Sequence, residues 1–312
     1  MIRILDGPAI ATALDYSELM ERIAAVFRSA ATAPLRHHHL FGANAGTLLL
    51  MPAWNNRFAG VKIATVVPGN TARGIANLQA TYFLLDGATG QPLAILEGRE
   101  LTLRRTAATS ALASRYLSRP DSARLLMVGA GALSSHLARA HARVRPIREI
   151  AVWNRTPARA EVLAQELRSE FADQGIVVRA TANLAASVAD ADIVSTSTLA
   201  TEPIVRGAWL KPGQHLDLVG GFRPHMREVD DETVRRASLY CDTRMAATQE
   251  SGDLIGPLSR GVIAPANILG DLFDLTRLEG PARTGPDEIT LFKSVGHAIE
   301  DLAAATLAFE RA

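Results

Sequence analysis

The apolar positions of the first part of the chain change from a helical to a strand-like pattern. Apolar residues recur at helical spacing over residues 16–29, which predicts a helix. Short β-rich segments follow, and a turn cluster lies between the last two, which indicates a hairpin in an antiparallel or mixed sheet. The predicted strands are residues 47–52, 60–67, 80–85 and 93–96. An alanine-rich run at 107–115 then predicts a helix that leads out of this region.

Past Pro120, short apolar strands alternate with helical stretches. The predicted strands are residues 124–128, 149–153, 176–180, 192–196, 215–219 and 238–242, and the clearest helices are 134–144 and 158–172. This alternation predicts a Rossmann fold, a doubly wound parallel sheet with helices on both faces. After a Gly- and Pro-rich loop, residues 294–311 predict one more amphipathic helix, which packs back on the first domain.

We therefore expect an α/β protein of two domains. Residues 1–115 together with 291–312 form a mixed-sheet α+β domain, and residues 116–290 form the Rossmann domain. A length of 312 residues agrees with two domains of ordinary size. The chain is 48% hydrophobic and 21% charged, which excludes a mainly disordered protein.

Charge and cysteine content exclude several classes of function. A formal net charge of +1 gives no electrostatic footprint for nucleic acid. The single cysteine, Cys241, excludes an internal disulfide and fits a reducing compartment, and we expect its thiol to be inert in a buried strand. No apolar run is long enough for a membrane span, and Asp6, Asp15 and Glu18 interrupt any signal peptide. We expect a soluble cytoplasmic protein.

A glycine-rich turn joins the strand at 124–128 to the next helix. Gly129 permits the tight turn, and Gly131 lets backbone N–H groups approach a pyrophosphate at the helix N-terminus. Ser134 stands where the dinucleotide fingerprint has a third glycine or alanine. The alternative is a plain structural turn. The strand before the turn and the helix after it favour dinucleotide binding, with Ala132 and Leu133 as further contacts.

The end of the second Rossmann strand indicates which dinucleotide binds. NAD-binding loops place an acidic residue here for the ribose hydroxyls, whereas this chain has Asn154, Arg155 and Thr156, followed by Arg159. A guanidinium can bind the 2′-phosphate of NADP in a bidentate manner. The alternative is a solvated arginine at a helix start. We predict NADPH, with NADH less favoured.

Three cations of the first domain lie in apolar surroundings. Lys62 is inside the strand at 60–67, Arg105 is at the mouth of a helix, and Arg36 precedes the sheet. A lysine in such a strand points to solvent or pairs with an anion, and spacing alone favours the solvent-exposed alternative.

At these residues the chain resembles the ornithine cyclodeaminase/mu-crystallin family. The likeness covers nearly the whole chain in the expected order. Matching stretches are residues 51–52, 60–71, 86–98, 105–108, the glycine loop, 198–204, 219–221, 227–231, 250–253 and 293–301. We add Thr198 and Val219 from these stretches to the cofactor-binding candidates, together with Thr196 at the end of the strand at 192–196.

The resemblance implies roles for the three cations. In the family, equivalent residues hold the substrate carboxylate near the nicotinamide, so Arg36, Lys62 and Arg105 become substrate-binding candidates, and Lys62 and Arg105 catalytic ones. Charge-assisted hydrogen bonds suit a carboxylate that enters a dry pocket. The resemblance also implies a homodimer joined through the substrate domains.

Two departures from the family pattern bear on the reaction. Phe222 stands where ornithine cyclodeaminases have an acid that handles amines and water, and Leu49 replaces a glutamate. The pocket, with Phe222 as an apolar wall, therefore suits an apolar ring that bears a carboxylate. The stretches 154–156 and 198–204 most resemble the ketimine reductase branch of the family. The predicted reaction is NADPH-dependent reduction of Δ1-pyrroline-2-carboxylate or Δ1-piperideine-2-carboxylate to L-proline or L-pipecolate. The alternatives are ornithine cyclodeaminase, an amino-acid dehydrogenase of the alanine type, and a non-catalytic ligand-binding protein.

Other candidate chemistry receives little support. In an extended segment, His37, His38 and His39 alternate between faces and cannot converge on one ion, so we predict no metal site. His225 follows a strand end, where it is either a proton donor or a surface residue. The chain has no Gly-x-Ser-x-Gly elbow to support hydrolase chemistry.

Overall fold

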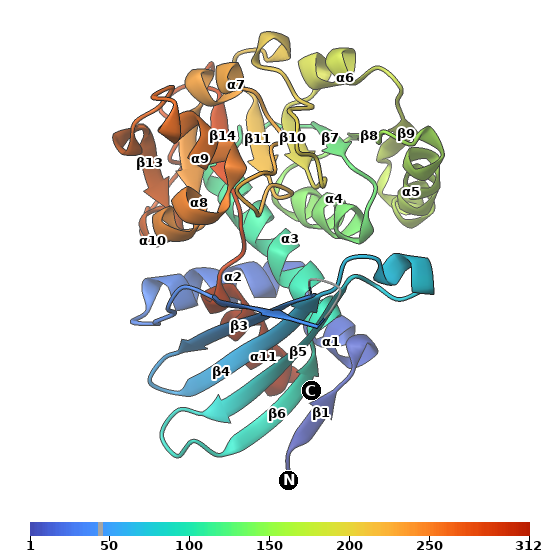
Figure 1. The fold of residues 1–312 in the computed structure, drawn as a ribbon. Helices are drawn as coiled ribbons and strands as arrows, with labels where there is room; N and C mark the ends of the chain where they lie inside the picture. Colours follow the sequence, from blue (N-terminus) through green and yellow to red (C-terminus); the bar gives the residue numbers. More distant parts are fainter. Residues whose placement is uncertain (43–45) are drawn as a thin grey trace. The chain divides into compact units, whose positions relative to one another are not determined.

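The computed structural model describes residues 1–42 and 46–312, which divide into two units. Unit 1 comprises residues 1–108 and 296–312, and unit 2 comprises residues 109–295 (Figure 1). The sequence predicts that the chain crosses between domains at 115/116 and 290/291. In the structure the chain passes into unit 2 between residues 108 and 109, inside the helix Gly98–Leu117. It returns to unit 1 between residues 295 and 296, just after the strand Thr290–Lys293.

Unit 1 contains a mixed sheet, as predicted. Among the described residues it has six strands in the order β1-β6-β5-β4-β3-β2, with β1 parallel to β6 and the other pairs antiparallel. The strands are β1 (Arg3–Leu5), β2 (His37–Phe41), β3 (Gly46–Trp54), β4 (Phe58–Val66), β5 (Leu78–Asp86) and β6 (Pro92–Glu97). The four predicted strands are β3 to β6. The short edge strands β1 and β2 were not predicted, because neither has an alternating apolar pattern.

Helices cover one face of this sheet. The predicted helix is α2 (Tyr16–Arg28), which begins after Asp15, whose carboxylate accepts hydrogen bonds from the N–H groups of Ser17 and Glu18. The C-terminal helix α11 (Ala298–Arg311) packs against α2 and strands β3 to β5, and α1 (Gly7–Ala13) contacts β6 and α11. Side chains alternate along a strand, so every second residue of β4 is buried on the α11 side. Lys62 is one of these residues.

Helix α3 (Gly98–Leu117) runs from unit 1 into unit 2. The predicted helix at 107–115 is only its second half. The first turn forms directly after β6, because the carboxylate of Glu97 accepts hydrogen bonds from the N–H groups of Arg99 and Glu100. This capping depends on backbone geometry that the apolar pattern does not reveal.

Unit 2 is a Rossmann-type α/β unit. Among the described residues, its parallel sheet has eight strands in the order β13-β12-β14-β11-β10-β7-β8-β9. The strands are β7 (Arg124–Val128), β8 (Glu149–Trp153), β9 (Val177–Ala180), β10 (Ile193–Thr196), β11 (His215–Leu218), β12 (Ser238–Cys241), β13 (Ile268–Asp271) and β14 (Thr290–Lys293). The chain reverses its direction of travel across the sheet between β7 and β10, which is where α/β sheets bind ligands.

The expectation of six strands for this sheet is wrong. Strands β13 and β14 are the additional ones, and β14 lies between β11 and β12. Both are only four residues long, and a segment of this length has no period that distinguishes it from a loop. Because β14 is central, residues 291–293 belong to the parallel sheet rather than to the first domain.

Helices and short 3₁₀ turns connect the strands. The helices of unit 2 are α4 (Ala132–Val144), α5 (Pro157–Glu170), α6 (Leu184–Asp190), α7 (Asp231–Arg236), α8 (Arg244–Glu250), α9 (Gly252–Ser259) and α10 (Leu272–Leu275). The 3₁₀ turns are η1 (Asn70–Arg73) in unit 1 and η2 (Ala172–Gln174), η3 (Gly207–Trp209) and η4 (Pro265–Asn267) in unit 2. Cys241 is buried in β12, as predicted. No helix in the described part of the chain has both the length and the apolar character to cross a membrane.

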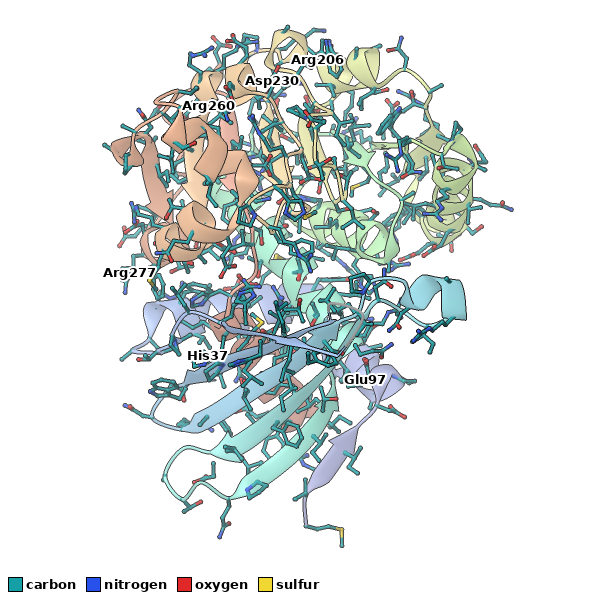
Figure 2. The ribbon with its side chains drawn as sticks, in the orientation of Figure 1. His37, Glu97, Arg206, Asp230, Arg260 and Arg277 are labelled. Carbon is teal, nitrogen blue, oxygen red and sulfur yellow. The ribbon has the colours of Figure 1, made fainter. Side chains whose placement is uncertain are left out.

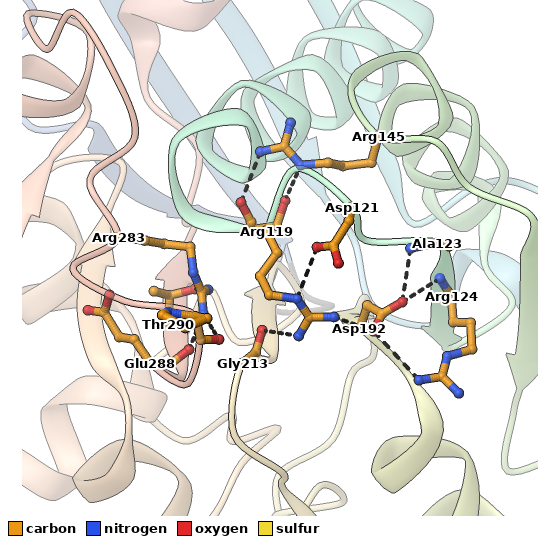
Figure 3. A network of polar contacts seen from close by, with 12 residues as sticks. Arg119, Asp121, Ala123, Arg124, Arg145, Asp192, Gly213, Arg283, Glu288 and Thr290 are labelled. Carbon is orange, nitrogen blue, oxygen red and sulfur yellow. Dashed lines mark hydrogen bonds and ion pairs between the residues drawn. The ribbon is translucent and has the colours of Figure 1, made fainter.

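Arginines hold the C-terminal end of α3 within unit 2 (Figure 3). Arg145 donates to the carbonyl oxygens of Ser114 and Ser118, each at 3.0 Å, and to the Ser118 hydroxyl at 2.7 Å. Arg119 pairs with Asp192 at 2.8 Å, and that carboxylate also accepts two backbone N–H groups at the start of β7. Cations are favourable at the end of a helix because the last carbonyls carry partial negative charge. The network therefore fixes α3 against the amino ends of β7 and β10.

Candidate functional site

In unit 1 the structure brings together the three cations that the sequence analysis singled out. Lys62 on β4 and Arg105 on α3 are 3% and 5% exposed, and both contact Asp301 in the first turn of α11. Lys62 Nζ lies 2.9 Å from Asp301 Oδ1 and 2.8 Å from Oδ2, and Arg105 Nε lies 2.8 Å from Oδ1. Arg105 also donates to Glu300 Oε2 at 2.6 Å. We call Arg36, Lys62, Arg105, Glu300 and Asp301 the Lys62 cluster.

Arg36 is the half-buried member of the Lys62 cluster. Its guanidinium donates to the carbonyl oxygen of Gly296 at 2.6 Å. Gly296 has a left-handed backbone (φ +83°), and a Cβ at this position would lie 2.6 Å from the guanidinium of Arg105. A side chain here would strain the backbone and displace Arg105, so glycine is required for the close approach of two arginines.

The Lys62 cluster combines three cations with two carboxylates, and their charges shift one another's pKa values. Burial, followed by the charge of Arg105, lowers the pKa of Lys62 to about 8, against the opposing effect of Asp301. Burial alone would raise the pKa of Asp301, but Arg105 and Lys62 outweigh it and hold that pKa below its usual range. The ammonium of Lys62 therefore loses its proton at a lower pH than that of an exposed lysine, and a bound anion would favour its charged form.

The sequence analysis missed both carboxylates of this cluster. Glu300 and Asp301 are wholly buried, although most acidic residues near a helix N-terminus are exposed. The sequence feature that could have identified them is a pair of adjacent acids near the start of an otherwise apolar helix. This pair lies within the stretch 293–301, which resembles the family. The acids could not be assigned, because their partners lie about 200 positions away in the chain.

Two further titratable groups, the half-buried His297 and the buried Tyr82, border the Lys62 cluster. His297 caps α11, and its Nδ1 accepts the N–H of Ile299 at 3.4 Å. Burial, followed by the charge of Arg36, lowers the pKa of His297 to about 4, so its ring is neutral at pH 7. Tyr82 is the cross-strand neighbour of Lys62, and among the described residues its buried hydroxyl has no hydrogen-bond partner.

In unit 2 the glycine loop follows β7 and opens α4, as predicted. Gly129 adopts φ +113°, and a Cβ there would lie 2.7 Å from the carbonyl oxygen of Ser197. The hydroxyl of Ser134 accepts the N–H of Gly131 at 3.2 Å and lies 2.9 Å from Ser197 Oγ. The serine at the third fingerprint position therefore ties the loop to the end of β10, which a glycine or alanine could not do.

Beyond the residues that follow β8, the start of α5 borders a hollow in the same unit. Asn154 is half-buried and donates its side-chain amide to the carbonyl oxygen of Thr156, whereas Arg155, Thr156 and Arg159 are exposed. The hollow has a volume of about 450 Å³. Its lining includes Ala130, Gly131, Ala132, Ser135, Ala158, Arg159 and Glu166. An arginine beside a glycine loop, with exposed backbone N–H groups, suits a dinucleotide phosphate.

The other cofactor-binding candidates of unit 2 surround a buried carboxylate that sequence reasoning missed. Glu228 Oε2 accepts hydrogen bonds from Thr196 Oγ1 and the N–H of Gly220, each at 2.7 Å. Its Oε1 accepts the N–H and the hydroxyl of Thr198, each at 2.8 Å. Val219 is buried beside these groups and donates its N–H to the carbonyl oxygen of Thr196. Glu228 thus joins the loops that follow β10 and β11.

The remaining candidates occupy separate places. Phe222 is half-buried, with the guanidinium of Arg223 5.7 Å from the centre of its ring. Leu133 on α4 and Leu49 on β3 are half-buried, and His225 is exposed. The three consecutive histidines lie on the exposed strand β2, where Figure 2 labels His37. Among the described residues, no group of three His, Cys, Asp or Glu side chains could hold a metal ion.

Comparison with known proteins identifies the family to which the chain is similar. The model of the ornithine cyclodeaminase/mu-crystallin family matches residues 5–312. The Δ1-pyrroline-2-carboxylate reductase of Paracoccus denitrificans is 40% identical over 267 residues, which cover 85% of this chain and 83% of the relative. Rat ketimine reductase mu-crystallin is 35% identical over 85% of this chain and 80% of the relative.

A solved structure extends this likeness to the fold. The Δ1-pyrroline-2-carboxylate reductase of Thermococcus litoralis, in complex with NADH and L-proline, has a TM-score of 0.94 at 33% identity. The match covers 99% of this chain and 97% of that one. This chain belongs to the ornithine cyclodeaminase/mu-crystallin family.

Proposed function

We propose that this protein reduces a cyclic ketimine carboxylate with NADPH: Δ1-pyrroline-2-carboxylate to L-proline, and its six-membered homologue Δ1-piperideine-2-carboxylate to L-pipecolate. The Paracoccus and rat relatives are reductases of this type by name, and the chain is an oxidoreductase acting on C=N bonds. The observation that carries the choice of substrate is the Lys62 cluster, in which the buried cations Lys62 and Arg105 converge on the carboxylate of Asp301.

The chemistry of the Lys62 cluster suits a substrate with one carboxylate. The guanidinium of Arg105 and the ammonium of Lys62 supply charge-assisted hydrogen bonds to such a carboxylate. An ammonium has three N–H donors and Asp301 offers two oxygens, so one donor of Lys62 remains for the substrate. Arg36, which is half-buried, adds a third cation.

The glycine loop, the hollow beside it and Arg155 fit a nicotinamide dinucleotide, which when bound supplies a hydride to the imine carbon. The cluster residues bind the carboxylate and orient the ring. A protonated imine carbon already accepts hydride readily, so orientation is the main task of the protein. The nearby His297 is neutral at pH 7 and adds no competing charge.

Three rival functions use the same fold. A cyclodeaminase requires acids for the amines of ornithine, and this chain has Phe222 and Leu49 at those positions. An amino-acid dehydrogenase would use a linear oxo acid and ammonia. A non-catalytic binding protein would retain ligand affinity without turnover.

The decisive experiment is oxidation of NADPH by the purified protein with each cyclic imine. We expect turnover with at least one ring, and ring size is left to the assay because one methylene changes binding by only about 1–3 kcal/mol. Release of ammonia from ornithine would instead support the cyclodeaminase, and ammonia-dependent NADPH oxidation with an oxo acid would support the dehydrogenase. Failure of folded protein to reduce either ring would refute the proposal.

The preference for NADPH is a separate prediction, resting on Arg155 and on the absence of an acid after β8. We expect kcat/KM to be at least about tenfold higher with NADPH than with NADH, equivalent to about 1.4 kcal/mol. Arg155→Ala should raise KM for NADPH and barely change KM for NADH. Arg148→Ala, an exposed arginine at the opposite end of β8, is the matched control and should change neither. Equal losses with both cofactors would show that Arg155 does not bind the phosphate.

We also propose a homodimer joined through the sheet of unit 1. Helix α11 packs on the face that carries Lys62, and the opposite face of β3, β4 and β5 presents half-buried apolar side chains. They include Leu48, Leu50, Val61, Ile63 and Phe83. Apolar sheet faces are usually covered in the native assembly.

The dimer is testable by sedimentation velocity. Val61→Asp places a charge in the centre of this face and should convert a dimer into monomers, because each copy would bury its aspartate against the other. The control is Leu269→Asp on β13, where an exposed leucine changes in the same way but lies in unit 2. A monomeric wild-type protein, or a dimer that withstands Val61→Asp, would contradict this interface.

A further inference from the structure

Lysine is rare in this chain, and its few positions are unusual. Of the 33 basic residues, only Lys62, Lys211 and Lys293 are lysines. Lys211 is exposed, but Lys62 and Lys293 are buried and each contacts an aspartate. Nearly all other basic residues of the chain are arginines, so the compact ammonium at Lys62 stands out against the guanidinium groups elsewhere. An ammonium can bind both oxygens of one carboxylate and still donate elsewhere, and unlike a guanidinium it can lose its proton.

Asp301 is the residue on which the two innermost cations converge. Its Oδ1 accepts from both Lys62 Nζ at 2.9 Å and Arg105 Nε at 2.8 Å, so the two cations meet at one oxygen atom. Glu300 contacts Arg105, whereas the ammonium of Lys62 contacts Asp301. The two adjacent acids thus differ in role: both neutralise Arg105, whereas Asp301 alone of the two contacts Lys62.

We propose that Asp301 is a positioning residue of the substrate site, which keeps Lys62 protonated and fixes its ammonium beside the guanidinium of Arg105 so that both can hold the substrate carboxylate. Asp301 need not touch the substrate. Without its charge, two buried cations would repel each other at close range, and the lysine would relieve this by losing its proton.

The charged and titratable groups around Lys62 support this role. From α3, Arg105 lowers the pKa of Lys62, and Arg36 does so more weakly from the segment before β2. On β5, the hydroxyl of Tyr82 is un-ionised, because burial and the charge of Asp301 raise its pKa well above the usual value. On α11, His297 is neutral at pH 7 and Glu300 contacts Arg105. Asp301 is therefore the group that opposes burial and keeps Lys62 charged near neutral pH.

The protonation of Lys62 can be measured directly. Protein labelled with [ε-¹³C]lysine should give three resonances, and the one missing from Lys62→Arg belongs to Lys62. In the wild type we expect this resonance to titrate near pH 8. In Asp301→Asn it should titrate about 1–3 pH units lower, the shift typical for loss of an adjacent opposite charge. An unchanged Lys62 titration in Asp301→Asn would overturn the proposal.

Glu300→Gln is the matched control, because it removes the neighbouring buried charge but leaves the contacts of Lys62 intact. We expect Glu300→Gln to move the Lys62 titration by less than half the shift produced by Asp301→Asn, and an equal or larger shift would overturn the assignment to Asp301. Asp301→Glu provides a second test should Asp301→Asn fail to fold. It keeps the charge and moves it by one methylene, so Lys62 should stay protonated as in the wild type while KM for the imine rises. Wild-type KM in Asp301→Glu would show that Asp301 fixes no alignment.

The kinetic readout rests on the proposed function, whereas the resonance titration does not. With a cyclic imine as substrate, KM should rise on the alkaline side of the Lys62 titration, and in Asp301→Asn this rise should begin about 1–3 pH units lower with kcat less affected. A merely structural role would lower stability without moving this profile. If no imine is reduced but the resonance shifts as expected, the positioning role stands and the proposed function fails.

Discussion

Arg105→Ala is expected to lower kcat/KM for either cyclic imine by about 10²- to 10³-fold and the free energy of unfolding by about 3–5 kcal/mol. The loss of stability follows from what remains in the Lys62 cluster. Glu300 and Asp301 are wholly buried, and Arg105 provides an ion pair to each of them. Removing the guanidinium takes one ion-pair partner from Glu300 and one from Asp301. Breaking a buried ion pair by removing one partner is among the costliest defects a substitution can create.

The loss of activity has a distinct cause, which a second substitution isolates. Arg105→Lys keeps a positive charge near both acids but lacks the planar fork that binds a carboxylate through two parallel hydrogen bonds. It should recover most of the stability in urea unfolding and only part of the lost kcat/KM. If Arg105→Lys matched the wild type in both measurements, charge alone would explain the role of Arg105.

Arg104→Ala is the control for the same helix. Arg104 is the neighbour of Arg105 on α3, but it pairs with Glu100 at the partly exposed surface and lies outside the Lys62 cluster. Pairs of this kind contribute about 0–1 kcal/mol. A loss of activity in Arg104→Ala equal to that in Arg105→Ala would point to general damage of α3 rather than to the cluster.

The sequence predicted the architecture wherever a segment was long enough to show its period. Strands β3 to β6 and the glycine loop between β7 and α4 have unambiguous patterns, so the mixed sheet and the Rossmann unit could be identified. Strand β14 could not, because four buried residues after a polar loop resemble many loop segments. Its place between β11 and β12 is set by tertiary packing of the whole sheet, which no local pattern encodes.

The same limit explains which part of the site was missed. Arg36, Lys62 and Arg105 stand out because a cation in an apolar segment is conspicuous in the sequence. Their acidic partners Glu300 and Asp301 look like an ordinary polar first turn, where carboxylates are favoured by the helix dipole. A buried cation nevertheless demands a counter-charge, so the need for an acid was inferable even though its identity was not.

The second large prediction concerns Glu228, the buried carboxylate of unit 2. Glu228→Gln is expected to lower the free energy of unfolding by about 2–4 kcal/mol, since at least one buried N–H group would lose its acceptor. Each oxygen of Glu228 accepts one backbone N–H, from Thr198 on one side and Gly220 on the other. A glutamine has only one acceptor oxygen, so its NH₂ group must face one of these donors.

The effect of Glu228→Gln should extend to cofactor binding if the loops after β10 and β11 contact the dinucleotide, as we propose for Thr196, Thr198 and Val219. We expect the Kd for NADPH to rise at least about tenfold, equivalent to about 1.4 kcal/mol, as measured by quenching of protein fluorescence. Glu232→Gln on α7 is the control, because Glu232 is exposed and forms an ion pair with the nearby surface residue Arg235. A destabilised Glu228→Gln protein that binds NADPH as tightly as the wild type would show that Glu228 supports the sheet but does not shape the cofactor site.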